Sequence, residues 1–140
     1  MARQRIVEIT DATATLSKNQ SGSLVVLNRA AGIVVTLPDA GRGLNYDFVM
    51  NVDASGAHEI RTYALGDSMQ GCIALASDTV SMNGFSATTA DLAMSMNGTT
   101  TGGKLGSRVK VVCDEDGVWH VDGLLIGSGT GVTPFYAPAA

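Results

Sequence analysis

The chain of 140 residues has the size of one domain, and its hydrophobic share of 45% against a charged share of 16% excludes a coiled coil and a disordered chain. Its net charge of -4 disfavours a nucleic-acid partner, because nucleic-acid binders normally carry a basic excess. Seventeen glycines, three prolines and few aromatic residues favour an all-β domain with tight turns.

The first third of the chain contains three short runs typical of strands. A β-branched run covers residues 6–10, and LVVLN follows at 24–28. IVVTL at 33–37 is ended by Pro38, which cannot donate a hydrogen bond to a neighbouring strand. The four residues between the last two runs have hairpin length, so we expect these runs to pair.

Two further strands and one helical turn are predicted nearby. Residues 46–52 alternate, which places Tyr46 and Phe48 on one face together with Met50 and Val52. Residues 59–63 alternate more weakly. A single helical turn is expected at 16–20, with Ser17 as its cap.

The middle of the chain, residues 71–103, contains CIALA, TVSM and DLAMSM. We expect three short strands here, separated by the turn-forming pairs Asn83-Gly84 and Asn97-Gly98. A helix over residues 87–96 is the alternative, since Leu92 and Met96 are four residues apart. The surrounding Ser, Thr and Gly residues are poor helix formers and favour the strands.

A hairpin is predicted from residues 108–114 and 118–125. RVKVVCD places Val109, Val111 and Cys113 on one face, and VWHVDGLL places Trp119 and Val121 on one face. The DEDG stretch between them turns the chain, with a glycine that accepts positive φ.

These elements predict a small antiparallel sandwich or jelly-roll-like domain with extended arms at both ends. We divide it into an N-terminal arm and first strand (1–12), a β domain (13–126) and an extended C-terminal arm (127–140). The interface candidates are Arg3 and Arg5 in the first arm and Phe135 and Tyr136 in the second. We expect Phe135 to anchor its arm on a neighbouring subunit; the alternative is that the arm folds back onto its own domain.

The sequence offers little for catalysis or metal binding. Its two histidines, His58 in a predicted loop and His120 in a predicted strand, belong to no CxxC or HxxxH pattern. Cys72 and Cys113 lie among apolar residues and are expected to be buried free thiols. We therefore expect no catalytic residues, no metal, no cofactor and no small-molecule substrate. The first residues lack the apolar core of a signal peptide, and no apolar run is long enough to span a membrane, so we expect neither secretion nor a membrane partner.

Two stretches resemble small virion proteins of tailed bacteriophages. The first covers residues 14–63, and its matching positions are Leu16, Ser21, Gly22, Thr36, Leu37, Pro38, Gly43, Leu44, Tyr46 and Phe48. The second covers residues 104–125, and its matching positions are Gly106, Arg108, Val109, Val111, Asp116, Gly117, Trp119, Val121 and Gly123. Ser107 departs from the pattern, which has an acidic residue there.

The resemblance is to the capsid decoration, or cement, proteins. It implies a structural, non-enzymatic protein that binds the outer surface of the capsid as a homotrimer and braces the major capsid protein. It also implies synthesis in the bacterial host cytoplasm. The alternative function is a tail or fibre module that binds a host-surface glycan, for which the candidate aromatic residues are Tyr46, Tyr63, Trp119, Phe135 and Tyr136.

Overall fold

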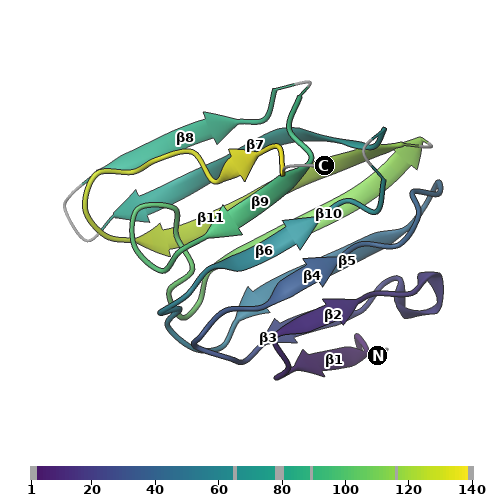
Figure 1. Ribbon diagram of the computed structural model, residues 1–140, viewed down its shortest axis with the longest axis horizontal. Coiled ribbons are helices and arrows are strands. Elements are labelled where there is room, and N and C mark those ends of the chain that lie inside the picture. Colours follow the sequence, from purple (N-terminus) through teal and green to yellow (C-terminus); the bar gives the residue numbers. More distant parts are fainter. Residues whose placement is uncertain (1–2, 65, 78–80, 89, 116, 139–140) are drawn as a thin grey trace.

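The computed structural model describes residues 3–64, 66–77, 81–88, 90–115 and 117–138. Within these residues the chain forms a β-sandwich, in which a seven-stranded sheet packs against a five-stranded sheet (Figure 1). The predicted all-β sandwich is confirmed. The sheets are mixed rather than antiparallel, however, because five of the ten strand pairings are parallel.

The first six strands alternate between the two sheets. The seven-stranded sheet receives β1 (Ile6–Ile9), β3 (Leu24–Leu27) and β5 (Asn45–Met50), and the five-stranded sheet receives β2 (Thr13–Thr15), β4 (Val34–Thr36) and β6 (His58–Arg61). Each strand lies parallel to its neighbour from the same group. The chain therefore winds as a short two-sided coil in this half.

The expected hairpin between residues 24–28 and 33–37 is wrong. Residues 29–32 instead carry the chain from one sheet to the other, because both strands are buried on one face and must face each other across the core. Gly32 has φ +103°, and a Cβ there would lie 2.3 Å from the carbonyl oxygen of Ala57. The connection at residues 29–32 therefore packs backbone against backbone on the connection that contains Ala57.

The second half of the chain completes both sheets. Its strands are β7 (Ser68–Ser77), β8 (Met82–Ser86), β9 (Ala93–Met96), β10 (Arg108–Glu115), β11 (Val118–Gly127) and β12 (Phe135–Tyr136). The sheet orders are β1-β3-β5-β10-β11-β7-β8 and β12-β9-β6-β4-β2. The predicted hairpin is confirmed as β10 and β11, which pair antiparallel with a bulge after Cys113. The predicted helical turn is confirmed as η1 (Lys18–Gln20), where the Gln20 side chain accepts the N–H of Ser17.

In the middle of the chain the strand prediction holds and the helix alternative is wrong, since Met94 and Met96 of β9 alternate into the core. The Asn97-Gly98 turn is confirmed: the Asn97 side chain accepts the N–H groups of Thr99 and Thr101. Asn83-Gly84 lies inside β8 and forms no turn. Residues 79 and 80 of the predicted TVSM strand (79–82) lie outside the described residues, and Met82 is the first residue of β8.

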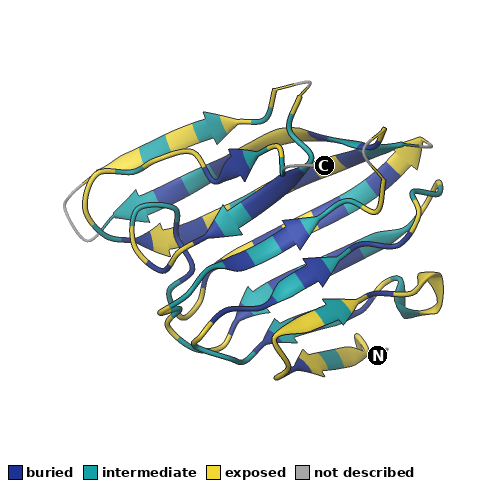
Figure 2. Cartoon of the chain, viewed as in Figure 1, coloured by how far each residue is buried: buried dark blue, intermediate teal, exposed yellow. Residues whose placement is uncertain are grey.

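The core lies between the sheets, where most strands bury alternate residues (Figure 2). Trp119 and Tyr46 are fully buried, and their ring centroids are 6.2 Å apart. The Tyr46 hydroxyl donates to the Ser17 carbonyl at 2.6 Å, which links β5 to the turn before β3. The Trp119 Nε1 has no hydrogen-bond partner among the described residues. Trp119 therefore stabilises the fold through ring packing alone.

We expect Trp119→Ala to lower the free energy of unfolding by about 3–5 kcal/mol, because it removes the largest fully buried side chain. Trp119→Phe is the matched control, since it retains an aromatic ring and removes an unpaired N–H; its loss should be much smaller. Denaturant unfolding followed by circular dichroism measures both. A loss below 1 kcal/mol for Trp119→Ala would contradict this role.

His58 lies in β6 with its side chain in the core, rather than in the predicted loop. Both ring nitrogens lack hydrogen-bond partners among the described residues. Burial lowers the pKa of His58 below its ordinary value of 6.5, since it penalises the charged form. As the pH falls, the unfolded chain therefore takes up this proton before the folded chain does.

The free energy of unfolding should consequently be constant above about pH 7 and fall as the pH drops through 6.5 and below. His58→Leu should flatten this decline, whereas His120→Gln, on the exposed face of β11, should retain it. Urea unfolding between pH 5 and 8 measures the three slopes. Equal slopes in wild type and His58→Leu would contradict the assignment.

Candidate protein-docking surface

The N-terminal interface candidates lie at the start of β1. Arg5 is tied to its own chain: its guanidinium donates to the Ser23 hydroxyl at 3.1 Å and to the Asn19 carbonyl at 2.6 Å. Arg3 is exposed beside it. Gln4 donates from its amide to the Asp47 carboxylate at 2.6 Å, on the outer face of the seven-stranded sheet. Arg5 thus holds the first strand in place, and Arg3 is the basic group left facing outward.

The C-terminal candidates lie in β12 at the edge of the five-stranded sheet. Phe135 is only 5% exposed and belongs to the core of its own chain. The Tyr136 hydroxyl donates to the Glu59 carboxylate, which also accepts two hydrogen bonds from Arg61. Phe135 therefore does not anchor the arm on a neighbouring subunit as expected; the alternative, an arm folded back onto its own domain, is what the structure has. The reason is that β12 pairs with the open edge of β9 and places Phe135 in the core beside it.

The outer faces of the two sheets differ in chemistry. The outer face of the five-stranded sheet is polar; its side chains are those of Thr13, Thr15, Thr36, Glu59, Arg61, Ser95 and Tyr136, with Val34 and Ala93 between them. The outer face of the seven-stranded sheet combines exposed apolar side chains with charges. The second face is the better candidate for docking another protein, because exposed apolar clusters mark interaction sites.

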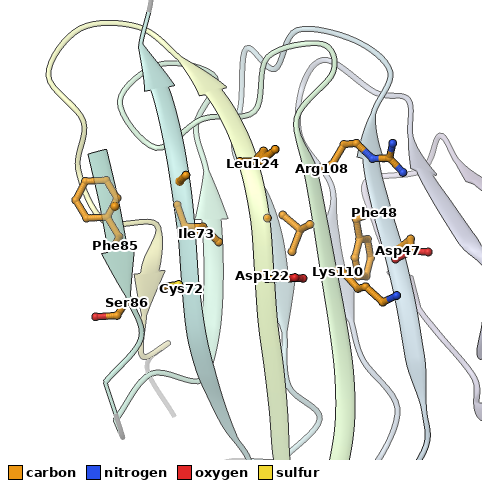
Figure 3. Close-up of a pocket in the computed structure, with 14 residues that line it drawn as sticks. Asp47, Phe48, Cys72, Ile73, Phe85, Ser86, Arg108, Lys110, Asp122 and Leu124 are labelled. Carbon is orange, nitrogen blue, oxygen red and sulfur yellow. The ribbon is translucent and has the colours of Figure 1, made fainter. Parts of the chain in front are cut away.

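A shallow open hollow of about 840 Å³ crosses this face over β5, β10, β11, β7 and β8 (Figure 3). One row across it is charged: Lys110 lies in register between Asp47 on β5 and Asp122 on β11. The next position in that row is Cys72, which is exposed and not buried as expected, because it lies on the outward side of β7. Cys113 is buried as predicted.

Apolar side chains lie on one side of the charged row, where Arg108 is in register beside Leu124. The row on the other side is polar, with Asn45, His120 and Gln70 in register around Val112. Leu124 lies in register with Ala74, and Ile126 lies in register with Ala76 and, one strand further, Met82. Leu124 and Met82 are each 65% exposed, and Ile126 is 40% exposed. Leu105, 57% exposed, belongs to the loop before β10. This loop lies beside Ile126: Lys104 donates to the Ile126 carbonyl, and a Cβ at Gly106 would lie 3.4 Å from Ile126 Cδ1. We call this set the apolar patch: Ala74, Ala76, Met82, Leu105, Leu124 and Ile126.

The alternation of apolar residues along single strands does not predict the apolar patch. The available signal was the uninterrupted run Leu124-Leu125-Ile126, in which one strand is apolar on both faces. Leu125 enters the core, so its two neighbours must point outward. An apolar run of this kind therefore places apolar side chains on the outer face as well as in the core.

The described part of the chain contains no group of three or more His, Cys, Asp or Glu side chains placed to hold a metal ion. Over the same residues, no helix is long and apolar enough to cross a membrane. The hollow is wide and open and combines an apolar half with a charged half. It is thus shaped for a protein surface more than for an enclosed small molecule.

Comparison with known proteins gives no relatives: no protein-family model matches the chain, and neither the curated proteins nor the solved structures contain a significant match.

The folded-back arm leads to a stability prediction. Phe135→Ala should lower the free energy of unfolding by about 3 kcal/mol, because its ring fills the core below β9. Tyr136→Phe keeps the strand and removes only the bond to Glu59, so it serves as the milder control. Both variants should keep the solution mass of the wild type. A change of mass with Phe135→Ala and an unchanged stability would contradict the assignment.

Proposed function

We propose that this protein is a capsid decoration protein of a tailed bacteriophage, which binds the outer surface of the head and braces the major capsid protein. It is made in the bacterial host cytoplasm and acts in the virion as a homotrimer. The observation that carries the proposal is the contrast between the two sheet faces: one presents the apolar patch beside a charged row, and the other is polar. The resemblance of residues 14–63 and 104–125 to decoration proteins supplies the kind of partner.

The proposed docking contact uses both halves of the face. Burial of Leu124, Ile126 and Met82 against a capsid protein supplies the favourable free energy, at about 25 cal/mol for each Å² of apolar surface covered. The row of Asp47, Lys110 and Asp122 sets the orientation, since alternating charges disfavour a shifted partner. Many weak contacts of this kind become effective on a shell with many copies, because of avidity.

The aromatic residues favour a structural role over glycan binding. A glycan site normally uses exposed aromatic rings as platforms. Trp119, Tyr46 and Phe135 are buried, and Tyr136 is half-buried with its hydroxyl bonded to Glu59. Tyr63 is the exposed aromatic residue among the five candidates, at 61%. A platform of several rings is therefore absent from the described surface.

The test is co-sedimentation of the purified protein with heads of the phage that encodes it, prepared without the protein. Leu124→Glu should weaken binding by at least about tenfold, because it replaces one of the two most exposed apolar side chains of the patch with a charge. Thr13→Glu, which places the same charge on the polar face, should bind as the wild type does. Circular dichroism shows that both variants are folded.

Three results would contradict the proposal. The first is wild-type protein that does not sediment with heads. The second is an equal loss of binding in both variants, which would mean that binding does not depend on the outer face of the seven-stranded sheet. The third is binding to isolated tails or to host-surface polysaccharide but not to heads, which would favour the tail or fibre module.

A further inference from the structure

The two edges of the seven-stranded sheet are complementary. β1 forms one edge and β8 the other, and they lie at opposite ends of the sheet (Figure 1). An edge strand presents unpaired N–H and C=O groups that another chain can bind. The two edges are therefore the places where a second chain can extend this sheet.

The edge of β8 is open to strand addition. Ser77 donates to Ser81 and Ala87 donates to Gly71, so the odd-numbered residues of β8 bond to β7. The backbone groups of Met82, Gly84 and Ser86 consequently point away from the sheet. The strand carries no charge, no proline and no bulge, which are the usual devices that protect an edge.

The edge of β1 offers the matching groups. Arg5 accepts from Leu24 and Ile9 accepts from Asn28, so residues 5, 7 and 9 bond to β3. The backbone groups of Ile6 and Glu8 then point outward. Ile6 is 64% exposed on the outer face, as Met82 is at the other edge, so joining the edges brings two exposed apolar side chains to one face.

Strand directions fit a ring of identical copies. Following the pairings across the sheet, β8 runs opposite to β1. Copies related by rotation about an axis along the strands share one direction, so β8 of one copy meets β1 of the next as an antiparallel pair. The edges of the five-stranded sheet are shorter, with three residues in β2 and two in β12.

We infer that the free edge of β8 binds the free edge of β1 in a second copy of this chain, and that this head-to-tail contact closes the oligomer into a ring. The inference rests on the self-association in the proposed function and does not depend on capsid binding. It names the contact between protomers. Because the axis runs along the strands, the seven-stranded sheets of the copies face in different directions around the ring, so the apolar patch of each copy meets the part of the capsid beside it. Met82 remains in that patch, next to Ile6 of the neighbouring copy.

Proline at edge-facing positions tests the contact, because it removes an outward N–H without breaking a bond within the sheet. Gly84→Pro blocks the β8 edge; Gly84 has no positive φ, and no described atom lies within 4 Å of its Cβ position. Glu8→Pro blocks the β1 edge. It also removes the hydrogen bond that the Glu8 carboxylate accepts from Asn28, so Glu8→Ala, which loses the same bond but keeps the outward N–H, is its control and should keep the wild-type mass. Thr15→Pro is the matched control, since its N–H points outward from β2: Leu16 donates to Thr36, and Val34 donates to Ala12.

Light scattering without capsids should give wild type and Thr15→Pro the mass of three chains of 14.4 kDa. Gly84→Pro and Glu8→Pro should each have the mass of one chain. An equimolar mixture of these two variants should have the mass of two chains, because each supplies the edge that the other lacks.

A monomeric wild type, proline variants that keep the wild-type mass, or a mixture that stays monomeric would each overturn the inference. Thermal unfolding verifies that the variants fold. If either proline variant is unfolded, Ile6→Cys combined with Gly84→Cys in a Cys72→Ser background replaces it. Oxidation should then link neighbouring copies, and absence of cross-linked chains would overturn the inference. Sedimentation with phage heads is measured separately, so failure of this contact is distinguishable from failure of capsid binding.

Discussion

The fold depends on burying two apolar sheet faces against each other in a chain with few charges. Each of the first six strands turns mainly apolar side chains toward the core, and the chain covers these side chains by crossing to the opposite sheet after each of the first five strands. The crossings stack closely enough that Gly32 and Gly56 have no room for a Cβ beside the neighbouring crossing. The Trp119 and Tyr46 rings fill the core where this coiled half meets the β10–β11 hairpin. The same two sheets then leave two outer faces, whose different chemistry underlies the proposed function.

The alternation of apolar residues and the turn-forming residues predicted those strands and turns that depend on residues close together in the sequence. The strand that contains Tyr46 and Phe48 could be predicted because its inward-facing residues alternate with outward-facing ones in the sequence. The hairpin that contains Trp119 could be predicted because its two strands are neighbours in the chain. The sequence did not predict that residues 29–32 connect the two sheets, because a loop of that length fits a hairpin and a sheet-to-sheet connection equally well. The choice is made by the stacking of Gly32 on Ala57, a contact between distant residues.

The candidate surface was predictable only in part. Phe135 and Tyr136 were recognised as unusual, but a strand of two residues has no period, so the sequence left open whether the arm folds back or reaches a neighbour. The pairing of β12 with β9 and the bond from Tyr136 to Glu59 decide for folding back. The apolar patch draws its residues from β7, β8, β11 and a loop, and only the register of the sheet brings them together.

The central claim is that the protein lies on the outside of a phage head with its seven-stranded sheet against the capsid. Cryo-electron microscopy of the virions that carry it tests this most directly. We predict density for this sandwich on the outer head surface, with Leu124 and Ile126 facing the major capsid protein and the threonine-rich face of β2 and β4 turned away from it. Density for the sandwich on the tail alone, or on the head with these two faces exchanged, would contradict it.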